Sequence, residues 1–136
     1  MAQRPLPRPT PETDHFWAGT RDGELRLQKC HACSHVYFPP RPFCPECSSR
    51  DVHVFRASGR GTLESYVINH RPHPAWTAPY AIALVKLAEG PRMMSNIVDC
   101  PQTPEALVLD MPLEVVFDKQ TDEITLPLFR PAGGAP

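Results

Sequence analysis

The sequence contains Cys30-His31-Ala32-Cys33 and, ten residues further on, Cys44-Pro45-Glu46-Cys47, and these two CxxC motifs decide its fold. Each motif forms a tight turn that can direct two sulfur atoms toward one point. Two such turns make a tetrahedral site of four thiolates, which suits Zn²⁺ and can also take iron. Because four thiolates fill the coordination shell, no position is left for a water molecule. We therefore predict a structural rather than a catalytic metal site.

Two other interpretations of the cysteine motifs stay open. His31 or His35 can replace one cysteine as a metal ligand. The motifs can also act as redox dithiols, although thioredoxin-type chemistry uses one CxxC at the start of a helix rather than two facing pairs. The fifth cysteine, Cys100, is expected to be an inert small residue.

Proline is the unusual component of the composition, with 18 prolines among 136 residues, against about 5% in an ordinary protein. Proline is excluded from helix interiors and central strands, so a helical bundle, a coiled coil and a doubly wound parallel sheet are poor fits. A chain of this length forms one domain or two very small ones. A region as short as residues 21–57 cannot bury enough apolar surface alone, and we expect the metal to supply the missing folding energy.

The N-terminal part of the chain is predicted to be an irregular arm of proline and arginine followed by one short helix. Thr10 can cap this helix, Pro11 fits its first turn and Gly19 can end it. The helix gives Phe16 and Trp17 a face to dock. We expect them to fill a small core, with a binding role as the alternative.

The remainder is predicted to be mainly β. Residues 24–38 and 52–55 contain short strands around the cysteine turns. Five further β-rich runs follow, at residues 62–69, 80–87, 92–98, 113–118 and 123–129. Their alternation suits a small antiparallel barrel, because closure removes the exposed edges of an open sheet. A helical turn over residues 105–109 is expected between the third and fourth runs.

These patterns divide the chain into four parts. They are an N-terminal arm and helix (1–20), a metal-binding region (21–57), a five-stranded barrel (58–130) and a C-terminal tail (131–136).

The loop from residue 70 to residue 79 concentrates side chains that can do chemistry. His70, Arg71, His73, Trp76 and Tyr80 lie on or next to it. In small barrels the loop after the first strand commonly lines the ligand face, so these residues can contact a ligand or a partner. The other interpretation is that the prolines and aromatic rings pack the loop down while the histidines stay solvated.

Arg92 is a second candidate anion contact, with a solvated cation as the alternative. The sequence contains no Ser/His/Asp or Cys/His arrangement typical of a nucleophilic enzyme, no paired carboxylates and no phosphate-binding glycine loop. We therefore predict no catalytic residues.

The N-terminal sequence, the lengths of the apolar runs and the distribution of charge limit where the protein can act and what it can bind. The sequence has no apolar leader and no apolar run long enough to cross a membrane, so we expect a cytoplasmic protein without disulfides. Residues 21–60 hold seven Arg or Lys against four Asp or Glu, a net charge of +3. Residues 61–136 hold five against nine, a net charge of −4. An acidic barrel argues against nucleic-acid binding, while the basic region keeps that alternative open.

The order of these motifs resembles the DUF35 family over roughly residues 13–130. The resemblance rests on Leu25-x-Leu27-Gln28-x-Cys30-x-x-Cys33, Phe38-Pro39-Pro40-Arg41, Cys44-Pro45-x-Cys47, Gly59-x-Gly61-Thr62-Leu63, Ala78-Pro79-Tyr80 to Leu84-Val85-x-Leu87, Glu89-Gly90-x-Arg92 and Pro127-x-Phe129. The family implies a rubredoxin-like zinc ribbon followed by an OB-fold, with Zn²⁺ on the four paired cysteines. One departure is Asp110-Met111, where the family usually has Gly-Met before the fourth barrel strand.

What the resemblance implies is an accessory subunit. Proteins of this family accompany thiolase-like enzymes, whose own chains carry the catalytic residues, and they are associated with acyl-CoA. Two motifs are most similar to the group that assists aldolases acting on steroid side-chain CoA thioesters: Ala78-Pro79-Tyr80 and Glu89-Gly90-Pro91-Arg92. We expect such a partner in a hetero-oligomer and no catalysis by this chain alone. The alternatives are a single-stranded nucleic-acid binder and an enzyme that uses His70 and His73.

Overall fold

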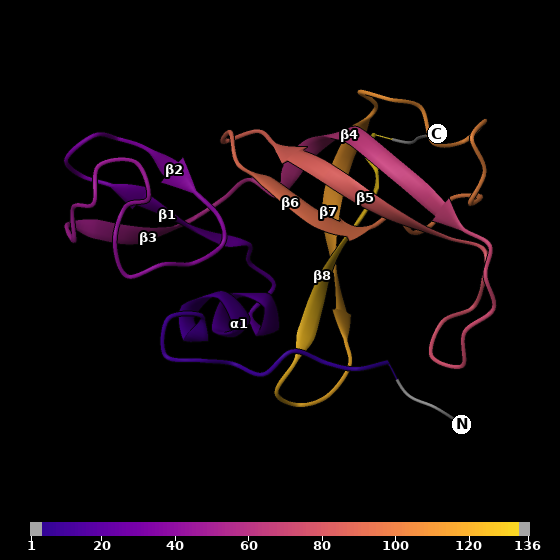
Figure 1. Ribbon diagram of the computed structural model, residues 1–136, viewed down its shortest axis with the longest axis horizontal. Helices are drawn as coiled ribbons and strands as arrows, with labels where there is room; N and C mark the ends of the chain where they lie inside the picture. Colours follow the sequence, from indigo (N-terminus) through magenta and orange to yellow (C-terminus); the bar gives the residue numbers. More distant parts are fainter. Residues whose placement is uncertain (1–3, 134–136) are drawn as a thin grey trace.

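The structure, a computed structural model, describes residues 4–133 and is mainly β with one short helix (Figure 1). A three-stranded sheet precedes a five-stranded barrel, as predicted. The elements in chain order are α1 (Asp14–Arg21), β1 (Arg26–Cys30), β2 (Val36–Tyr37), β3 (Val52–Arg56), β4 (Arg60–Asn69), β5 (Tyr80–Leu87), β6 (Arg92–Asn96), β7 (Pro112–Lys119) and β8 (Thr125–Pro131). Residues 1–3 of the predicted arm and 134–136 of the predicted tail lie outside the described residues.

The helix begins later than the sequence predicts. Thr13, not Thr10, is the N-cap, and the Thr10 backbone N–H donates to the Thr13 hydroxyl at 2.9 Å. Gly19 does not end the helix but lies within it, buried, where an added Cβ would meet the Arg26 side chain at 2.7 Å. The small residue is therefore needed for close packing. The chain turns only at Gly23, which has a φ of +76° that favours glycine.

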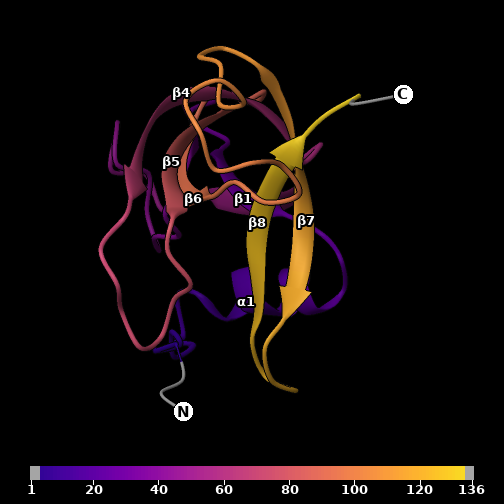
Figure 2. The same cartoon turned by 90° about the vertical axis from the view of Figure 1, so that its right-hand side faces the viewer.

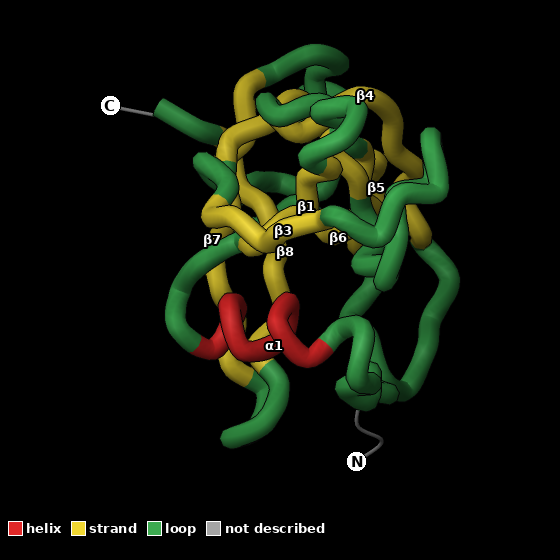
Figure 3. The backbone as a smooth tube through the Cα atoms, turned by 90° about the vertical axis from the view of Figure 1, so that its left-hand side faces the viewer, coloured by secondary structure: helices red, strands yellow, loops and turns green. Residues whose placement is uncertain are grey.

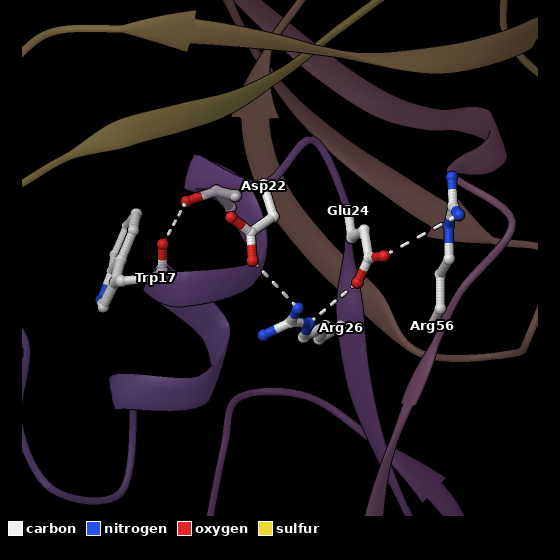
Figure 4. A network of polar contacts seen from close by, with 6 residues as sticks. Trp17, Asp22, Glu24, Arg26 and Arg56 are labelled. Carbon is white, nitrogen blue, oxygen red and sulfur yellow. Dashed lines mark hydrogen bonds and ion pairs between the residues drawn. The ribbon is translucent and has the colours of Figure 1, made fainter.

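The three-stranded sheet has the order β2-β1-β3 and is antiparallel. Arg26 at the start of β1 pairs with Asp22 at 3.3 Å and with Glu24 at 3.0 Å, and Glu24 also lies 3.8 Å from Arg56 of β3 (Figure 4). This chain of charges ties the end of α1 to the sheet. Figure 3 shows α1 lying across the lower ends of the barrel strands, where it contacts β7 and β8.

The barrel has the strand order β6-β5-β4-β7-β8, with every neighbouring pair antiparallel. Strand β4 is long and curves over the barrel (Figure 2). Its residues 60–62 pair with β7, and it pairs with β5 from Gly61 to Asn69, with a bulge between Leu63 and Ser65. Strands β6 and β8 almost close the barrel. They are joined by a bridge between Ile97 and Phe129 and by the Ser95 hydroxyl, which donates to the Pro127 carbonyl at 2.8 Å.

One hydrophobic core joins the helix, the three-stranded sheet and the barrel. The helix contributes the buried Phe16, as predicted, and Trp17 packs partly buried against the same cluster. The remaining buried members are Leu25, Leu27, Ala57, Leu63, Ala81, Ala83, Val85, Leu87, Met93, Ile97, Leu107, Leu113 and Phe129. The metal-binding region is thus fused to the barrel through shared apolar surface.

The connection between β6 and β7 differs slightly from expectation. The helical turn predicted over residues 105–109 begins at Thr103, whose carbonyl accepts from the N–H groups of Ala106 at 3.1 Å and Leu107 at 3.0 Å. Thr103 starts the turn because its hydroxyl also accepts from Ala106 N–H, as an N-cap does. Among residues 4–133, no helix is long and apolar enough to span a membrane.

Candidate functional site

The two CxxC turns have the same backbone geometry. The Ser34 N–H donates to the Cys30 carbonyl and the Ser48 N–H donates to the Cys44 carbonyl, both at 2.9 Å. Both serines have a φ of 65°, a left-handed conformation that lets the chain reverse directly after the second cysteine. Each CxxC sequence therefore folds into a turn that holds its two sulfurs on one side.

The four sulfur atoms converge on one point. Cys30 Sγ lies 3.6 Å from Cys47 Sγ, Cys33 Sγ lies 3.6 Å from Cys44 Sγ, and all four lie within 4.8 Å of one another. A tetrahedral zinc site with Zn–S bonds of about 2.3 Å has sulfur–sulfur separations of about 3.8 Å. The cysteines are therefore positioned to bind a metal ion of this size.

Crowding of the thiols shows why a cation suits this site. The backbone hydrogen bond from Cys33 favours the thiolate of Cys30, and with help from the Cys47 side chain it lowers the pKa of Cys30 to about 7. At Cys33 the backbone hydrogen bond from His35 favours the thiolate as well, but desolvation and the neighbouring thiols outweigh it and raise the pKa to about 12. A bound divalent cation removes this conflict, because coordinated thiols are deprotonated outright.

The second turn supplies a further oriented donor. The Glu46 backbone N–H donates to Cys44 Sγ at 3.3 Å. Cys30 and Cys44 are fully buried, whereas Cys33 and Cys47 reach the surface. The site therefore has a buried side that faces the core and an accessible side through which an ion can enter.

The histidines near the cysteines lie outside this cluster. The metal-binding group found within residues 4–133 consists of the four paired cysteines only. The His31 ring stacks on the His53 ring, with 4.1 Å between the ring centres, and the His35 ring stacks on the Tyr37 ring, with 6.1 Å between the ring centres. Cys100 lies in the loop after β6, where burial, and then the charge of Asp99, raises the pKa of its thiol. Its sulfur is thereby kept protonated.

The loop between β4 and β5 brings together three of its predicted contact residues (Figure 1). The Trp76 ring stacks on the Tyr80 ring, with 6.0 Å between the ring centres, and its centre lies 4.8 Å from that of the His73 ring. The Tyr80 hydroxyl accepts from the Asn69 side chain at 2.7 Å, and the guanidinium of Arg4 lies 5.7 Å from the Trp76 ring centre. The loop is thus organised around Trp76.

The other predicted contact residues are not part of this cluster. His70 and Arg71 are exposed at the start of the loop. Arg92 is the first residue of β6, at the end of the strand away from this loop, and its Nε donates to the Glu64 carboxylate of β4 at 2.8 Å. Glu64 was not predicted, because nothing in the sequence shows that β4 and β6 lie on either side of β5.

Three hollows that the sequence did not reveal adjoin Trp76, and two of them also adjoin Met94. One, of about 310 Å³, lies where α1, β6 and β8 meet and is lined mainly by apolar side chains such as Trp17, Phe38 and Met93. The other, of about 340 Å³, is lined by Trp76, Tyr80, Ile82, Met94, Ser95 and Asn96. Alternation along β5 and β6 separates inward from outward residues, but it does not show which outward residues adjoin the loop.

Residues 17–53 match the family model described as the ChsH2 rubredoxin-like zinc ribbon domain, and residues 55–118 match the model of the ChsH2 C-terminal OB-fold domain. The chain belongs to the DUF35/ChsH2 family. Its four paired cysteines are therefore those of a zinc ribbon.

Two curated relatives and one solved structure are informative. A "Probable enoyl-CoA hydratase alpha subunit" of Thermomonospora curvata is 40% identical over 93% of this chain. A "3-oxo-4,17-pregnadiene-20-carboxyl-CoA hydratase alpha subunit" of Mycobacterium tuberculosis is 34% identical over 82% of this chain. This chain spans only 40% and 35% of the lengths of these relatives. A solved structure named "Ltp2-ChsH2(DUF35) aldolase" matches with a TM-score of 0.82 and 36% identity, covering 93% of this chain and 99% of that chain.

Proposed function

We propose that this DUF35/ChsH2 chain is a non-catalytic accessory subunit of a thiolase-like enzyme that processes acyl-CoA thioesters. The observation that carries the proposal is the structural match to the ChsH2(DUF35) chain of an aldolase complex, which extends over nearly the full length of both chains. The family resemblance of the sequence supports the same conclusion, because it implies a thiolase-like partner that carries the catalytic residues.

The metal centre supports a structural role. We propose that Cys30, Cys33, Cys44 and Cys47 hold one Zn²⁺ ion. A shell of four thiolates has no open position for water or substrate, so the ion stabilises the fold and takes no part in a reaction. The loop histidines do not form a catalytic arrangement with it: His73 Nδ1 accepts from the Ala75 N–H at 2.9 Å, and His70 is exposed.

We propose steroid side-chain CoA thioesters as the substrate class and aldol cleavage as the reaction of the complex. The support is the combination of a relative named for a pregnadiene carboxyl-CoA and a matching structure named as an aldolase. The partner holds the reacting atoms in this proposal. The exposed Arg71 and the stacked Trp76 and Tyr80 are the residues of this chain that would contact a ligand or the partner.

The test is assembly with a defined partner. The chain would be produced together with the thiolase-like protein encoded in the same genome, and the mixture would be separated by size-exclusion chromatography with light scattering. We expect one peak containing both chains at a fixed ratio, with zinc bound. Separate elution of the two folded proteins at micromolar concentration would contradict the proposal.

A further inference from the structure

One face of the barrel has exposed apolar side chains on its outer side. The side chains of β4, β5 and β6 alternate between the core and this outer side, which we call the β4–β5–β6 face. Its apolar members are Val67, Tyr80, Ile82, Leu84 and Met94. In the strand register Val67 lies beside Ile82, and Leu84 lies beside Met94, so they form one continuous surface.

Exposure is high at two apolar members of this face, whereas Tyr80, Ile82 and Leu84 are half-buried. Val67 is 60% exposed and Met94 is 72% exposed, the highest value among the large hydrophobic residues described. The hollow beside Trp76 is open on the same face, with Tyr80, Ile82 and Met94 in its lining. Contiguous exposed apolar surface of this kind marks an interaction site in a folded protein.

The charges around the face are mostly positive. Arg4 lies over Trp76 and Arg71 is exposed in the adjoining loop, at one end of the face. Lys86 and Arg92 lie at the other end, and Arg92 is paired with Glu64.

Asp99 also borders the loop end, but it lies 3.9 Å from Arg130. An apolar centre with cations at both ends fits a partner surface that is apolar in the middle and carries carboxylates at its edges.

A second copy of this chain fits the face poorly. In a dimer with its two-fold axis parallel to the strands, the loop end of the face, with Arg4 and Arg71, would meet the same end of the second copy. With the axis perpendicular to the strands, the loop end of one copy would meet the Lys86 end of the other. Both arrangements place like charges opposite each other.

Single-stranded nucleic acid also fits poorly. Its bases need aromatic stacking platforms, whereas the centre of this face is aliphatic. Tyr80, the aromatic member of the face, lies at its loop end and stacks on Trp76 with an angle of 20° between the two ring planes.

We propose that the β4–β5–β6 face is the docking surface for the thiolase-like subunit, against an apolar patch of that subunit bordered by acidic side chains. This inference rests on the proposed function. It specifies the face that docks. The zinc ribbon lies outside this face, although its residues 34–39 line a hollow together with Arg92 at the edge of the face.

The experiment compares two valines of nearly equal exposure. Val67→Glu places a charge in the centre of the face, and Met94→Glu does the same from the neighbouring strand. Val108→Glu is the matched control, because Val108 is 58% exposed but lies in the loop between β6 and β7. Binding of each purified variant to the thiolase-like protein from the same genome would be measured by isothermal titration calorimetry, after circular dichroism has verified folding.

We expect Val67→Glu and Met94→Glu to raise the Kd at least about tenfold, and Val108→Glu to change it less than about twofold. If wild type binds and both face variants bind equally well, the docking face is wrong while the proposed function stands. If folded wild type does not bind, the proposed function itself fails.

Two further measurements distinguish other occupants. If wild type binds a twelve-nucleotide oligothymidine and Val67→Glu abolishes that binding, the face belongs to a nucleic-acid site and the inference is overturned. A wild-type dimer in sedimentation that Val67→Glu converts to a monomer would assign it to a second copy, with the same consequence. Absence of both effects, together with loss of partner binding, supports the inference.

Discussion

Single residues in this chain hold backbone conformations that their side chains disfavour. Asp110 has a φ of 68° at the turn into β7, and its N–H donates to the Leu63 carbonyl at 2.7 Å. The DUF35 resemblance implies glycine at this position, and the backbone conformation gives a physical reason for it, since only glycine adopts this conformation without steric cost. The departure therefore costs stability but preserves the turn.

Replacing Asp110 by glycine should stabilise the protein. Asp110→Gly removes the left-handed strain, and we expect a gain of roughly 0.5–1 kcal/mol in the free energy of unfolding, partly offset by the added freedom of the unfolded chain. Urea unfolding followed by fluorescence measures this change. Asp110→Ala is the control and should be less stable than wild type, because alanine enters the left-handed region less readily than aspartate. Equal stability of the two variants would contradict this explanation.

His15 of α1 should make stability depend on pH. Burial, and then the nearby Arg26 guanidinium, lowers the pKa of His15 below its ordinary value of 6.5, against a smaller opposing effect of Asp14. The unfolded chain therefore takes up a proton first as the pH falls below about 6.5, and stability falls from that pH downward.

The comparison is between wild type and His15→Gln, unfolded by urea at pH 7.5 and pH 5.5. Wild type should lose more stability between the two pH values than the variant, since other acid-sensitive groups, including the metal thiolates, are common to both. Identical losses would show that His15 does not contribute.

At the scale of elements, the CxxC turns were predictable and the register of the barrel was not. Two CxxC motifs specify a four-sulfur site through local spacing alone, and the alternation at residues 113–118 identified β7 directly. The predicted start of α1 was wrong because Thr10 begins a preceding turn, in which its carbonyl accepts from the Thr13 N–H at 2.9 Å. The N-cap Thr13 makes no side-chain capping hydrogen bond that a sequence pattern could have revealed. The bulge in β4 and the Arg92–Glu64 pair depend on contacts between distant segments, which no local pattern encodes.

Loss of the metal should unfold the elements that the cysteine turns organise. Cys44→Ser removes a buried ligand, and we expect loss of bound zinc and of cooperative unfolding. Cys100→Ser is the matched control outside the cluster and should keep about one zinc per chain with a stability change of less than about 1 kcal/mol. Zinc content by mass spectrometry and thermal melting by circular dichroism measure both. A metal-free Cys44→Ser protein that melts like wild type would refute a structural role for the ion.

At the scale of the whole molecule, the fold places a zinc ribbon and a barrel around one hydrophobic core and leaves one apolar barrel face exposed. The sequence predicted the two parts and the kind of partner. It did not predict which face would dock, because the exposed residues come from three strands whose register is set by the fold. The account assigns assembly to this chain and the chemistry to its partner.

Retro-aldol cleavage of a steroid side-chain CoA thioester tests that assignment most directly. The rate would be measured for this chain alone, for the thiolase-like protein alone and for the two combined at equal concentrations. We expect cleavage by the complex, with no turnover by this chain and little or none by the partner alone. Turnover by this chain alone, or an equal rate for the partner with and without it, would show that this chain is not an accessory subunit of the kind proposed.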